Sequence, residues 1–436
     1  MTDPEPTARL SRVPDEVPRD QELRSLELLL GGGAQEVLTR AVAEEGGVVQ
    51  EARPRFVAYR PGRRIVVRYW ADVRWRDGSS SQTTIVATER RSGPPPGALE
   101  VEAAGTTLGV WRWPGDPQLP GLKAAANADY VRALLDAYGA PPGRIFLRTM
   151  SYWPGRRAVI EVTIPPRGLK FDPARGRVEK KPGTLLMFIK VVRQGRAQPL
   201  YELHRTLGGA LPIASCPGGS DEHGLLVLEA LAGHTLGQTL TRAPAYAPAP
   251  GEVLQLVHRL GRFQLALDPR NTTDEKVAGH LELLRAVLPG EAATLDRLAE
   301  AYGEGAPQPL TTVHGDFHES QILIDRGAIS GLLDVDDAGP GQLVDDLALL
   351  VGRVWALGHF AQGNRAAIRR YAERLLDAFS EEVDEAELRR RIAGALIGRA
   401  TMPFRGQDPG WATEASLRLR LAEEWLAQHA GERATA

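Results

Sequence analysis

Acidic and amide side chains gather between residues 313 and 348, among segments that are otherwise apolar. Residues 314–321 read HGDFHESQ, residues 333–336 read LDVD, and residues 346–348 read DLA. The acids come directly after apolar, strand-like runs such as ILI at 322–324 and LL at 332–333. A carboxylate next to buried strand residues is costly unless it binds a cation or joins a hydrogen-bond network. The cluster therefore predicts a functional site.

The spacing of three residues in this cluster indicates the chemistry. An acid at Asp316, an amide five residues later at Gln321 and an acid after a strand–turn–strand at Asp334 are typical of phosphoryl-transfer loops. In that layout one aspartate accepts the proton of a substrate hydroxyl. The amide and the second aspartate hold Mg²⁺ in the same cleft.

These motifs resemble those of the aminoglycoside phosphotransferase family, the protein-kinase-like small-molecule kinases that include choline kinases and maltokinases. The family pattern H-G-D-x-H-x-x-N is matched by residues 314–321 except at its last position, and the LDVD and DLA motifs match throughout. The resemblance implies that Asp316 is the catalytic base or orients the acceptor hydroxyl. His314, in the same catalytic loop, is expected to position that loop rather than to shuttle protons.

The resemblance also implies the metal-binding and supporting residues. Asp334 would bridge the nucleotide phosphates through Mg²⁺, Asp336 would face a second ion, and Asp346 would brace the catalytic loop through its backbone. Gln321 stands where the family has a metal-binding asparagine, and it offers the same carbonyl oxygen on a longer side chain. The alternative is that Gln321 only caps the loop and one metal is lost.

A nucleotide-binding lobe is expected upstream. In the family a strand lysine contacts the phosphates of ATP or GTP, and a glutamate on the next helix holds the lysine. Only six of the 53 basic residues are lysines, and Lys190 lies in the apolar run LLMFIKVV, with Glu202 as its candidate partner. The alternative places Lys190 on the solvent face of the strand. By the same resemblance, the backbone of Glu229 and Leu231 would bind the purine.

One segment of this lobe repeats a segment that precedes the lobe. Residues 59–64 read YRPGRR and residues 152–157 read YWPGRR, and each is followed by β-branched strands. Aligning TTIVAT at 83–88 with LLMFIK at 185–190 sets Thr88 opposite Lys190, so a first copy would lack the phosphate-binding lysine. The alternative is that PGRR is a common turn in an arginine-rich chain.

The predicted fold class is α+β: a bilobal protein-kinase-like fold with an antiparallel-sheet N-lobe, a helical C-lobe and an extra N-terminal β-rich cap. We expect a disordered tail at 1–19, the cap at 20–140, the N-lobe at 141–232 and the C-lobe at 233–436.

Composition limits the possible partners. The formal net charge is −2, which excludes a generally basic nucleic-acid-binding protein. There is no run of about 18 apolar residues, and the N-terminus is acidic and proline-rich rather than a secretory signal. A single cysteine excludes a disulfide framework. We therefore expect a cytoplasmic chain with no nucleic-acid or membrane partner.

The leading hypothesis is an ATP- or GTP-dependent O-phosphotransferase that acts on a small hydroxylated molecule such as a sugar, an antibiotic or another natural product. Two alternatives stay open. One is a nucleotide-binding pseudokinase or scaffold, and the other is a kinase that acts on peptide serine or threonine in natural-product maturation.

Overall fold

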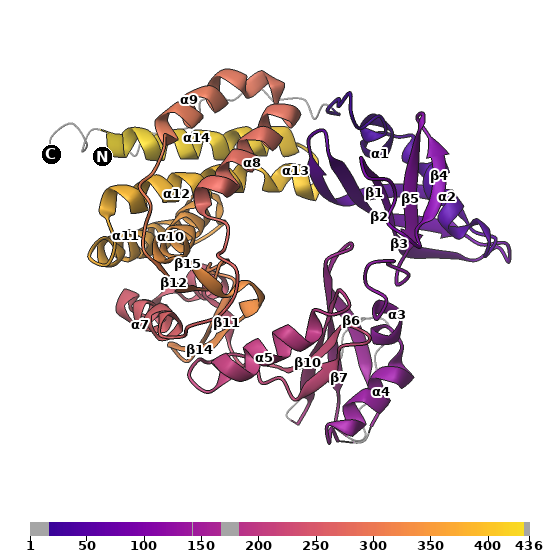
Figure 1. Ribbon diagram of the computed structural model, residues 1–436, viewed down its shortest axis with the longest axis horizontal. Helices are drawn as coiled ribbons and strands as arrows, with labels where there is room; N and C mark the ends of the chain where they lie inside the picture. Colours follow the sequence, from indigo (N-terminus) through magenta and orange to yellow (C-terminus); the bar gives the residue numbers. More distant parts are fainter. Residues whose placement is uncertain (1–16, 142, 167–182, 431–436) are drawn as a thin grey trace.

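The computed structural model describes residues 17–141, 143–166 and 183–430. Figure 1 shows two sheet-containing units and a helical unit that follow one another around a central space. Most of the predicted tail, residues 1–16 of 1–19, lies outside the described residues. The other elements fall into the N-terminal cap, the N-lobe and the C-lobe.

The N-terminal cap contains a five-stranded antiparallel sheet of strand order β1-β2-β3-β5-β4. Side chains alternate between the two faces of a strand, so β2 turns Ile65, Val67 and Tyr69 toward α1 and α2 and Val66 toward the N-lobe. The elements are α1 (Leu26–Leu30), α2 (Ala34–Ala43), β1 (Val48–Arg60), β2 (Arg64–Arg74), β3 (Ser80–Arg90), β4 (Leu99–Ala103) and β5 (Thr106–Arg112).

The N-lobe contains a second five-stranded antiparallel sheet, of order β6-β7-β8-β10-β9. Strands β7 and β8 are buried along almost their whole length, because α4 packs on the sheet and the cap supplies Trp111 and Val86 to the same core. The elements are α3 (Leu122–Ala125), α4 (Ala128–Ala137), β6 (Phe146–Trp153), β7 (Arg157–Ile164), β8 (Leu185–Val192), α5 (Ala197–Gly208), β9 (Gly218–Ser220) and β10 (Leu225–Glu229). The helices α3 and α4 lie within the range predicted for the cap, 20–140, but their apolar side chains pack in the core of the second sheet.

The two sheets have the same order of strands and a corresponding register. In the cap, Val66 pairs with Thr88 across β2 and β3. In the N-lobe, Val159 pairs with Lys190 across β7 and β8. Val66 and Val159 are two residues past the ends of the matching PGRR turns. Thr88 therefore takes the position of Lys190 in the first sheet, which supports the duplication hypothesis.

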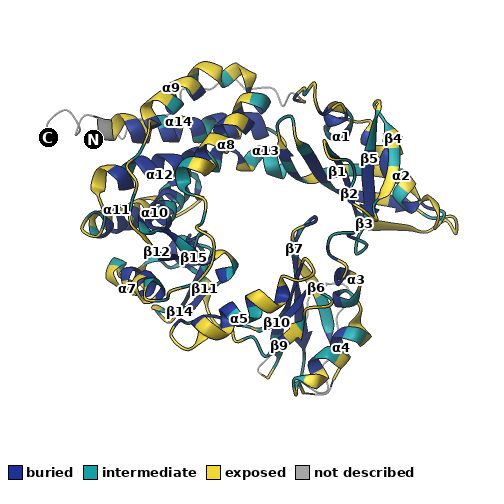
Figure 2. Ribbon diagram, viewed as in Figure 1, coloured by how far each residue is buried: buried dark blue, intermediate teal, exposed yellow. Residues whose placement is uncertain are grey.

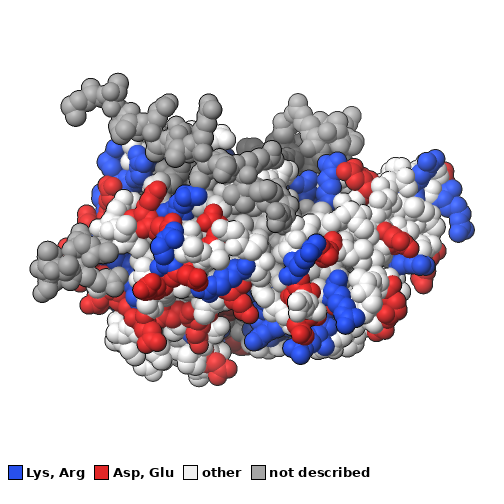
Figure 3. Space-filling model, turned by 90° about the horizontal axis from the view of Figure 1, so that it is seen from above, with Lys and Arg blue, Asp and Glu red and all other residues white. Residues whose placement is uncertain are grey.

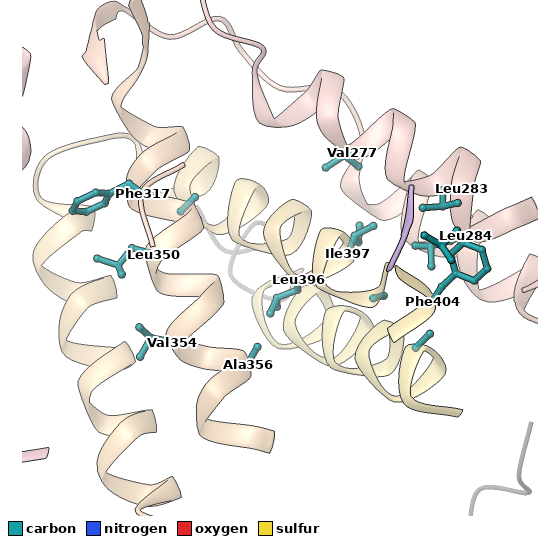
Figure 4. Packing of buried hydrophobic residues seen from close by; sticks show 14 of the residues in the cluster. Val277, Leu283, Leu284, Phe317, Leu350, Val354, Ala356, Leu396, Ile397 and Phe404 are labelled. Atoms are coloured by element: carbon teal, nitrogen blue, oxygen red, sulfur yellow. The ribbon is translucent and has the colours of Figure 1, made fainter. Parts of the chain in front are cut away.

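The C-lobe is mainly helical and carries two small sheets, β11-β13-β14 and β12-β15. Figure 4 shows part of its core, where Leu350 and Val354 of α10 lie near Phe317 of the catalytic loop. The elements are β11 (His234–Thr235), α6 (Leu236–Arg242), α7 (Pro250–Gly261), α8 (Thr273–Val287), α9 (Ala292–Tyr302), β12 (Leu310–Val313), β13 (Ile322–Asp325), β14 (Ala328–Leu332), β15 (Gly339–Gln342), α10 (Leu343–Phe360), α11 (Arg365–Ser380), α12 (Glu385–Ala400), α13 (Met402–Gly406) and α14 (Trp411–Ala430).

The cap contacts both lobes. The ring of Phe56 in the cap contacts the ring of Trp153 in the N-lobe, with their centroids 4.9 Å apart. The ring of Tyr59 in the cap contacts the ring of Phe404 in α13, with their centroids 6.2 Å apart. Figure 2 shows the N-lobe strands as largely buried and the outer turns of α9 as exposed. The predicted fold class is confirmed, because an antiparallel-sheet lobe, a helical lobe and an extra β-rich unit are all present.

The charged side chains on the face seen from above are of both signs and interspersed (Figure 3), in keeping with the small net charge. Across the described residues, no helix has the length and apolar character needed to cross a membrane.

Candidate functional site

The catalytic loop, residues 314–321, connects β12 to β13 and is held by α10. The carboxylate of Asp346 is 2% exposed and accepts hydrogen bonds from the backbone N–H groups of His314 at 2.6 Å and Gly315 at 3.0 Å. Gly315 has φ +82°, and a Cβ there would lie 2.6 Å from the carbonyl oxygen of Asp337. A glycine is therefore required at this turn. Burial raises the pKa of Asp346.

His314 is fully buried and connects the catalytic loop to the segment that carries Asp334. Its Nε2 lies 2.8 Å from the carbonyl oxygen of Leu333, and its Nδ1 lies 3.3 Å from the backbone nitrogen of Asp316. Both contacts are satisfied by a neutral ring that donates from Nε2 and accepts at Nδ1. A ring engaged on both sides positions Asp316 and has no free nitrogen for proton transfer.

Asp316 is the acid of the loop that faces open space, with a side chain 46% exposed. Its Oδ2 lies 3.6 Å from Nε2 of His318. Burial acts to raise the pKa of Asp316, but its interactions with His318 and His314, above all the hydrogen bond with His318, outweigh burial and hold the pKa below its ordinary value. The carboxylate is therefore ionised at neutral pH and can accept a hydrogen bond from a hydroxyl group.

Lys190 reaches across from β8 to the acids that follow β14. Its Nζ lies 2.8 Å from Oδ1 of Asp334 and 2.5 Å from Oδ1 of Asp336. Lys190 is only 5% exposed, so the solvent-face alternative does not hold. Arg157 binds the same acid with both guanidinium nitrogens, at 2.9 and 2.8 Å from the two carboxylate oxygens of Asp334.

These two cations decide the ionisation of Asp334. Burial would raise its pKa, but the charges of Lys190 and Arg157 lower the pKa to about 2. The backbone of Asp334 is left-handed, with φ 57°. Non-glycine residues in this conformation are strained and cluster at functional sites. The carboxylate is thus held ionised by Lys190 and Arg157.

The predicted pairing of Lys190 with Glu202 is wrong. Glu202 lies on α5 with a side chain 44% exposed, and it binds Arg205 at 2.8 Å and Gln198 at 3.0 Å. The buried face of α5 carries His204 instead, whose Nδ1 lies 3.2 Å from the carbonyl oxygen of Ala214. Glu202 and His204 are two residues apart, which on a helix places them on different faces.

The turn at 152–157 is fixed by an acid that sequence reasoning did not single out. Asp116 is 3% exposed and accepts hydrogen bonds from the Tyr152 hydroxyl at 2.8 Å and the backbone N–H of Gly155 at 2.7 Å. Arg157 lies in the same turn, and its ion pair with Asp334 spans 177 residues, so no local signal could have indicated it.

The remaining predicted residues are placed less completely. Gln321 lines the same cavity as Asp316, and its Nε2 lies 3.4 Å from Nε2 of His318. Glu229 ends β10, and Leu231 lies in the connector to β11. Neither Glu229 nor Leu231 lines this cavity. Metal binding by Gln321 and purine binding at the connector stay predictions.

A cavity of about 440 Å³ is lined by the catalytic loop, the N-lobe turn and C-lobe helices. Arg157 lines it, but Lys190, Asp334 and Asp336 do not. The catalytic loop contributes Asp316, His318 and Gln321, and the N-lobe turn contributes Trp153, Arg156 and Arg157. The opposite wall is formed by α8, α12 and α13 of the C-lobe. Among the residues that the structure describes, no three His, Cys, Asp or Glu side chains are grouped so as to hold a metal ion.

Three solved structures of aminoglycoside phosphotransferases are similar to this chain. The chain is 16% identical to APH(2")-IIia in a complex with GDP and kanamycin, over 70% of this chain and all of that one, with a TM-score of 0.47. It is 14% identical to a thermostable mutant of aminoglycoside phosphotransferase APH(4)-Ia bound to AMP-PNP and hygromycin B, over 69% and 99%, at 0.46. It is 13% identical to APH(2")-IIa bound to streptomycin and ATP, over 67% and 98%, at 0.44.

No curated protein matches the chain. Residues 189–395 match the sequence model of the phosphotransferase enzyme family, abbreviated APH. The matched segment starts beside Lys190 and contains the catalytic loop, Asp334 and Asp346. The family resemblance and the phosphotransferase class predicted from the sequence are therefore confirmed, with the family match covering residues 189–395, slightly less than half of the chain.

Proposed function

We propose that the chain transfers the γ-phosphate of ATP or GTP to a hydroxyl group of a small molecule. The observation that carries the proposal is that Asp316 and Arg157 line one cavity, and that Arg157 also binds Asp334, the partner of Lys190. Asp316 is suited to bind a hydroxyl group, and Lys190 and Arg157 are suited to bind phosphates. Phosphoryl transfer depends almost entirely on bringing these two kinds of group into line.

In this proposal Asp316 orients the acceptor. Its ionised carboxylate accepts a hydrogen bond from the hydroxyl group and takes the proton as the oxygen–phosphorus bond forms. His314 holds the backbone of Asp316, and Asp346 holds the backbone of His314. The acid is thus positioned by two residues that do not touch the substrate.

Lys190 and Arg157 are the phosphate-binding residues of the proposal. Both bind Asp334 in the structure, and both carry donors that match phosphate oxygens. The backbone of Glu229 and Leu231 would bind the purine. Gly155, whose carbonyl oxygen accepts from Arg193 at 2.7 Å, lies in the turn expected to cover the phosphates.

The acids near Lys190 fit a magnesium ion by the chemistry of their donors. Asp334 and Asp336 offer carboxylate oxygens and Gln321 offers an amide oxygen, the hard ligands that Mg²⁺ prefers. Mg²⁺ is commonly held by one or two carboxylates together with substrate phosphates, so a preformed group of three acids is not needed. When bound, the ion would neutralise charge on the transferred phosphate.

The proposal is tested by following the γ-phosphate. Nucleotide labelled with ³²P at the γ-position is incubated with Mg²⁺ and a library of sugars, aminoglycosides, nucleosides and peptides. We expect labelled product with a small-molecule acceptor for the wild type and a loss of at least about 100-fold for Asp316→Asn. Label on peptides alone would indicate the peptide kinase instead. Nucleotide binding without transfer to any acceptor would indicate a pseudokinase.

A further inference from the structure

The cavity that contains Asp316 is lined by seven cationic and four acidic side chains. Five of the seven cations have no carboxylate within ion-pair distance in the described part of the chain. Arg270 and Lys276 donate to backbone carbonyl groups instead, whereas the side chains of Arg156, Arg399 and Arg405 have no such acceptor among the described residues. Arg399 lies at the end of α12, Arg405 lies on α13, and Arg156 lies in the N-lobe turn. The three unpaired arginines therefore reach the cavity from both lobes.

The four acids of the cavity do not neutralise these arginines, and Asp337 makes no ion pair with any of the three in the described part of the chain. Asp345 is paired with Arg391 and accepts from the backbone N–H of Thr273 at 3.2 Å. Asp346 is occupied by the backbone of the catalytic loop. Asp316 lies beside His318. An unpaired, partly buried cation is costly, so the surplus positive charge is either unfavourable or used by a ligand.

Further cations lie close to these arginines and affect their pKa values. Burial lowers the pKa of Arg405, and the charges of Arg156 and Arg60 lower it further. For Arg64, at the cap's own turn, the causes are burial and four other arginines. Burial and the charge of Arg353 lower the pKa of Arg399 to about 10, against the opposing charge of Glu319. All remain charged at neutral pH.

Arg399 and Arg405 lie on different elements from the predicted phosphate-binding residues. Lys190 and Arg157 are occupied by Asp334 and Asp336 on the nucleotide side. Arg399 and Arg405 lie on the wall formed by the C-lobe helices, next to Met402 and Thr401 and in the same cavity as Asp316. That wall faces the space in which an acceptor hydroxyl would meet Asp316.

We propose that the acceptor carries an anionic group, a phosphate or a carboxylate, which Arg399 and Arg405 bind on the C-lobe wall together with Arg156 of the N-lobe turn. This inference rests on the proposed function and names its substrate class. Arginine suits the role because its planar guanidinium matches the oxygens of phosphate and carboxylate in pairs. A polycationic acceptor would be repelled by the same side chains.

The binding test uses the full chain saturated with Mg²⁺ and AMP-PNP and titrates it calorimetrically with inorganic phosphate. We expect saturable binding that weakens at least about tenfold in Arg399→Gln and in Arg405→Gln, because a charge-assisted contact is lost. Arg405→Lys should recover part of the affinity. Arg326→Gln is the matched control, because the Arg326 side chain is 93% exposed. Melting curves verify that each variant is folded.

Two outcomes of this titration overturn the inference. One is phosphate affinity that is absent or unchanged in both glutamine variants, which would indicate an adventitious ion only. The other is a loss of AMP-PNP affinity with phosphate affinity unchanged, because the arginines would then serve the nucleotide.

The turnover test compares a hexose, its 6-phosphate, the corresponding uronic acid and the corresponding amino sugar as acceptors. We expect a higher kcat/KM for one of the anionic acceptors, and the phosphate and carboxylate arms identify which. Faster transfer to the neutral or cationic sugar would overturn the inference and keep the proposed function. Arginine-dependent phosphate binding with no transfer to any acceptor would keep the anion site and overturn the proposed function.

Discussion

Replacing Lys190 by methionine removes one of the two cations that hold the Asp334–Asp336 pair. Methionine is close to lysine in length and suits an apolar strand, so the change removes charge without opening a large cavity. Lys190 is 5% exposed and lies within 2.8 Å of both acids. The variant leaves Arg157 as the remaining direct partner of two buried carboxylates.

The magnitude follows from the ionisation of Asp334. Its pKa is about 2, against 3.8 ordinarily, which is equivalent to about 2 kcal/mol of favourable interaction with the ionised form. Lys190 and Arg157 share that stabilisation, so we expect the free energy of unfolding at pH 7 to fall by about 1–2 kcal/mol. The contribution is present above pH 3.8 and is lost as the pH falls toward 2, because Asp334 is then protonated in the folded state as well.

The assay is urea unfolding of four chains at pH 7: wild type, Lys190→Met, Asp334→Asn and the double variant. If Lys190 acts through the acid, its replacement should cost at least about 1 kcal/mol less in the Asp334→Asn background. Lys123→Met is the control, because Lys123 is exposed and should change stability by less than about 0.5 kcal/mol. Equal costs in both backgrounds, within about 0.5 kcal/mol, would refute the coupling.

Three further predictions concern the catalytic loop and the cap. In His318→Ala, burial of Asp316 is no longer opposed by the histidine, so its pKa should rise and the acid limb of the rate profile should move from below pH 3.8 to higher pH; an unmoved limb would contradict this role. Asp346→Ala leaves the N–H groups of His314 and Gly315 without an acceptor. It should lower the free energy of unfolding in urea by about 1–3 kcal/mol and should also reduce turnover. Asp346→Asn keeps an acceptor and should have a smaller effect on both. Calorimetry should find one nucleotide per chain, because Thr88 takes the place of Lys190 in the cap; two sites would exclude the degenerate copy.

Local sequence patterns were sufficient for the main units and for the core of the site. Alternating and continuous apolar runs predicted β2 and β8, because strand side chains alternate and fully covered strands are apolar throughout. The acids of residues 314–336 and the lone strand lysine at Lys190 predicted residues that the structure brings together. Each signal lay within one short segment.

The parts that were missed depend on side-chain direction or on long-range contact. Glu202 was assigned by its distance from Lys190 along the chain, but the phase of α5 turns it toward Arg205. Arg157 and Asp116 gain their roles from partners far away in sequence or from backbone groups. The cap's contact with α13 through Tyr59 and Phe404 joins residues more than 300 positions apart, and no pattern within either segment encodes it.

The most direct test of the central claim measures two properties of Asp316→Ala side by side: the rate of γ-phosphate transfer and the calorimetric affinity for the nucleotide. Asp316 is proposed to act on the acceptor hydroxyl, while Lys190, Arg157 and Asp334 act on the nucleotide side. We therefore predict that transfer falls by about 100-fold or more, while the nucleotide Kd stays within about threefold of the wild type. A comparable loss of nucleotide affinity, or transfer at the wild-type rate, would contradict the account.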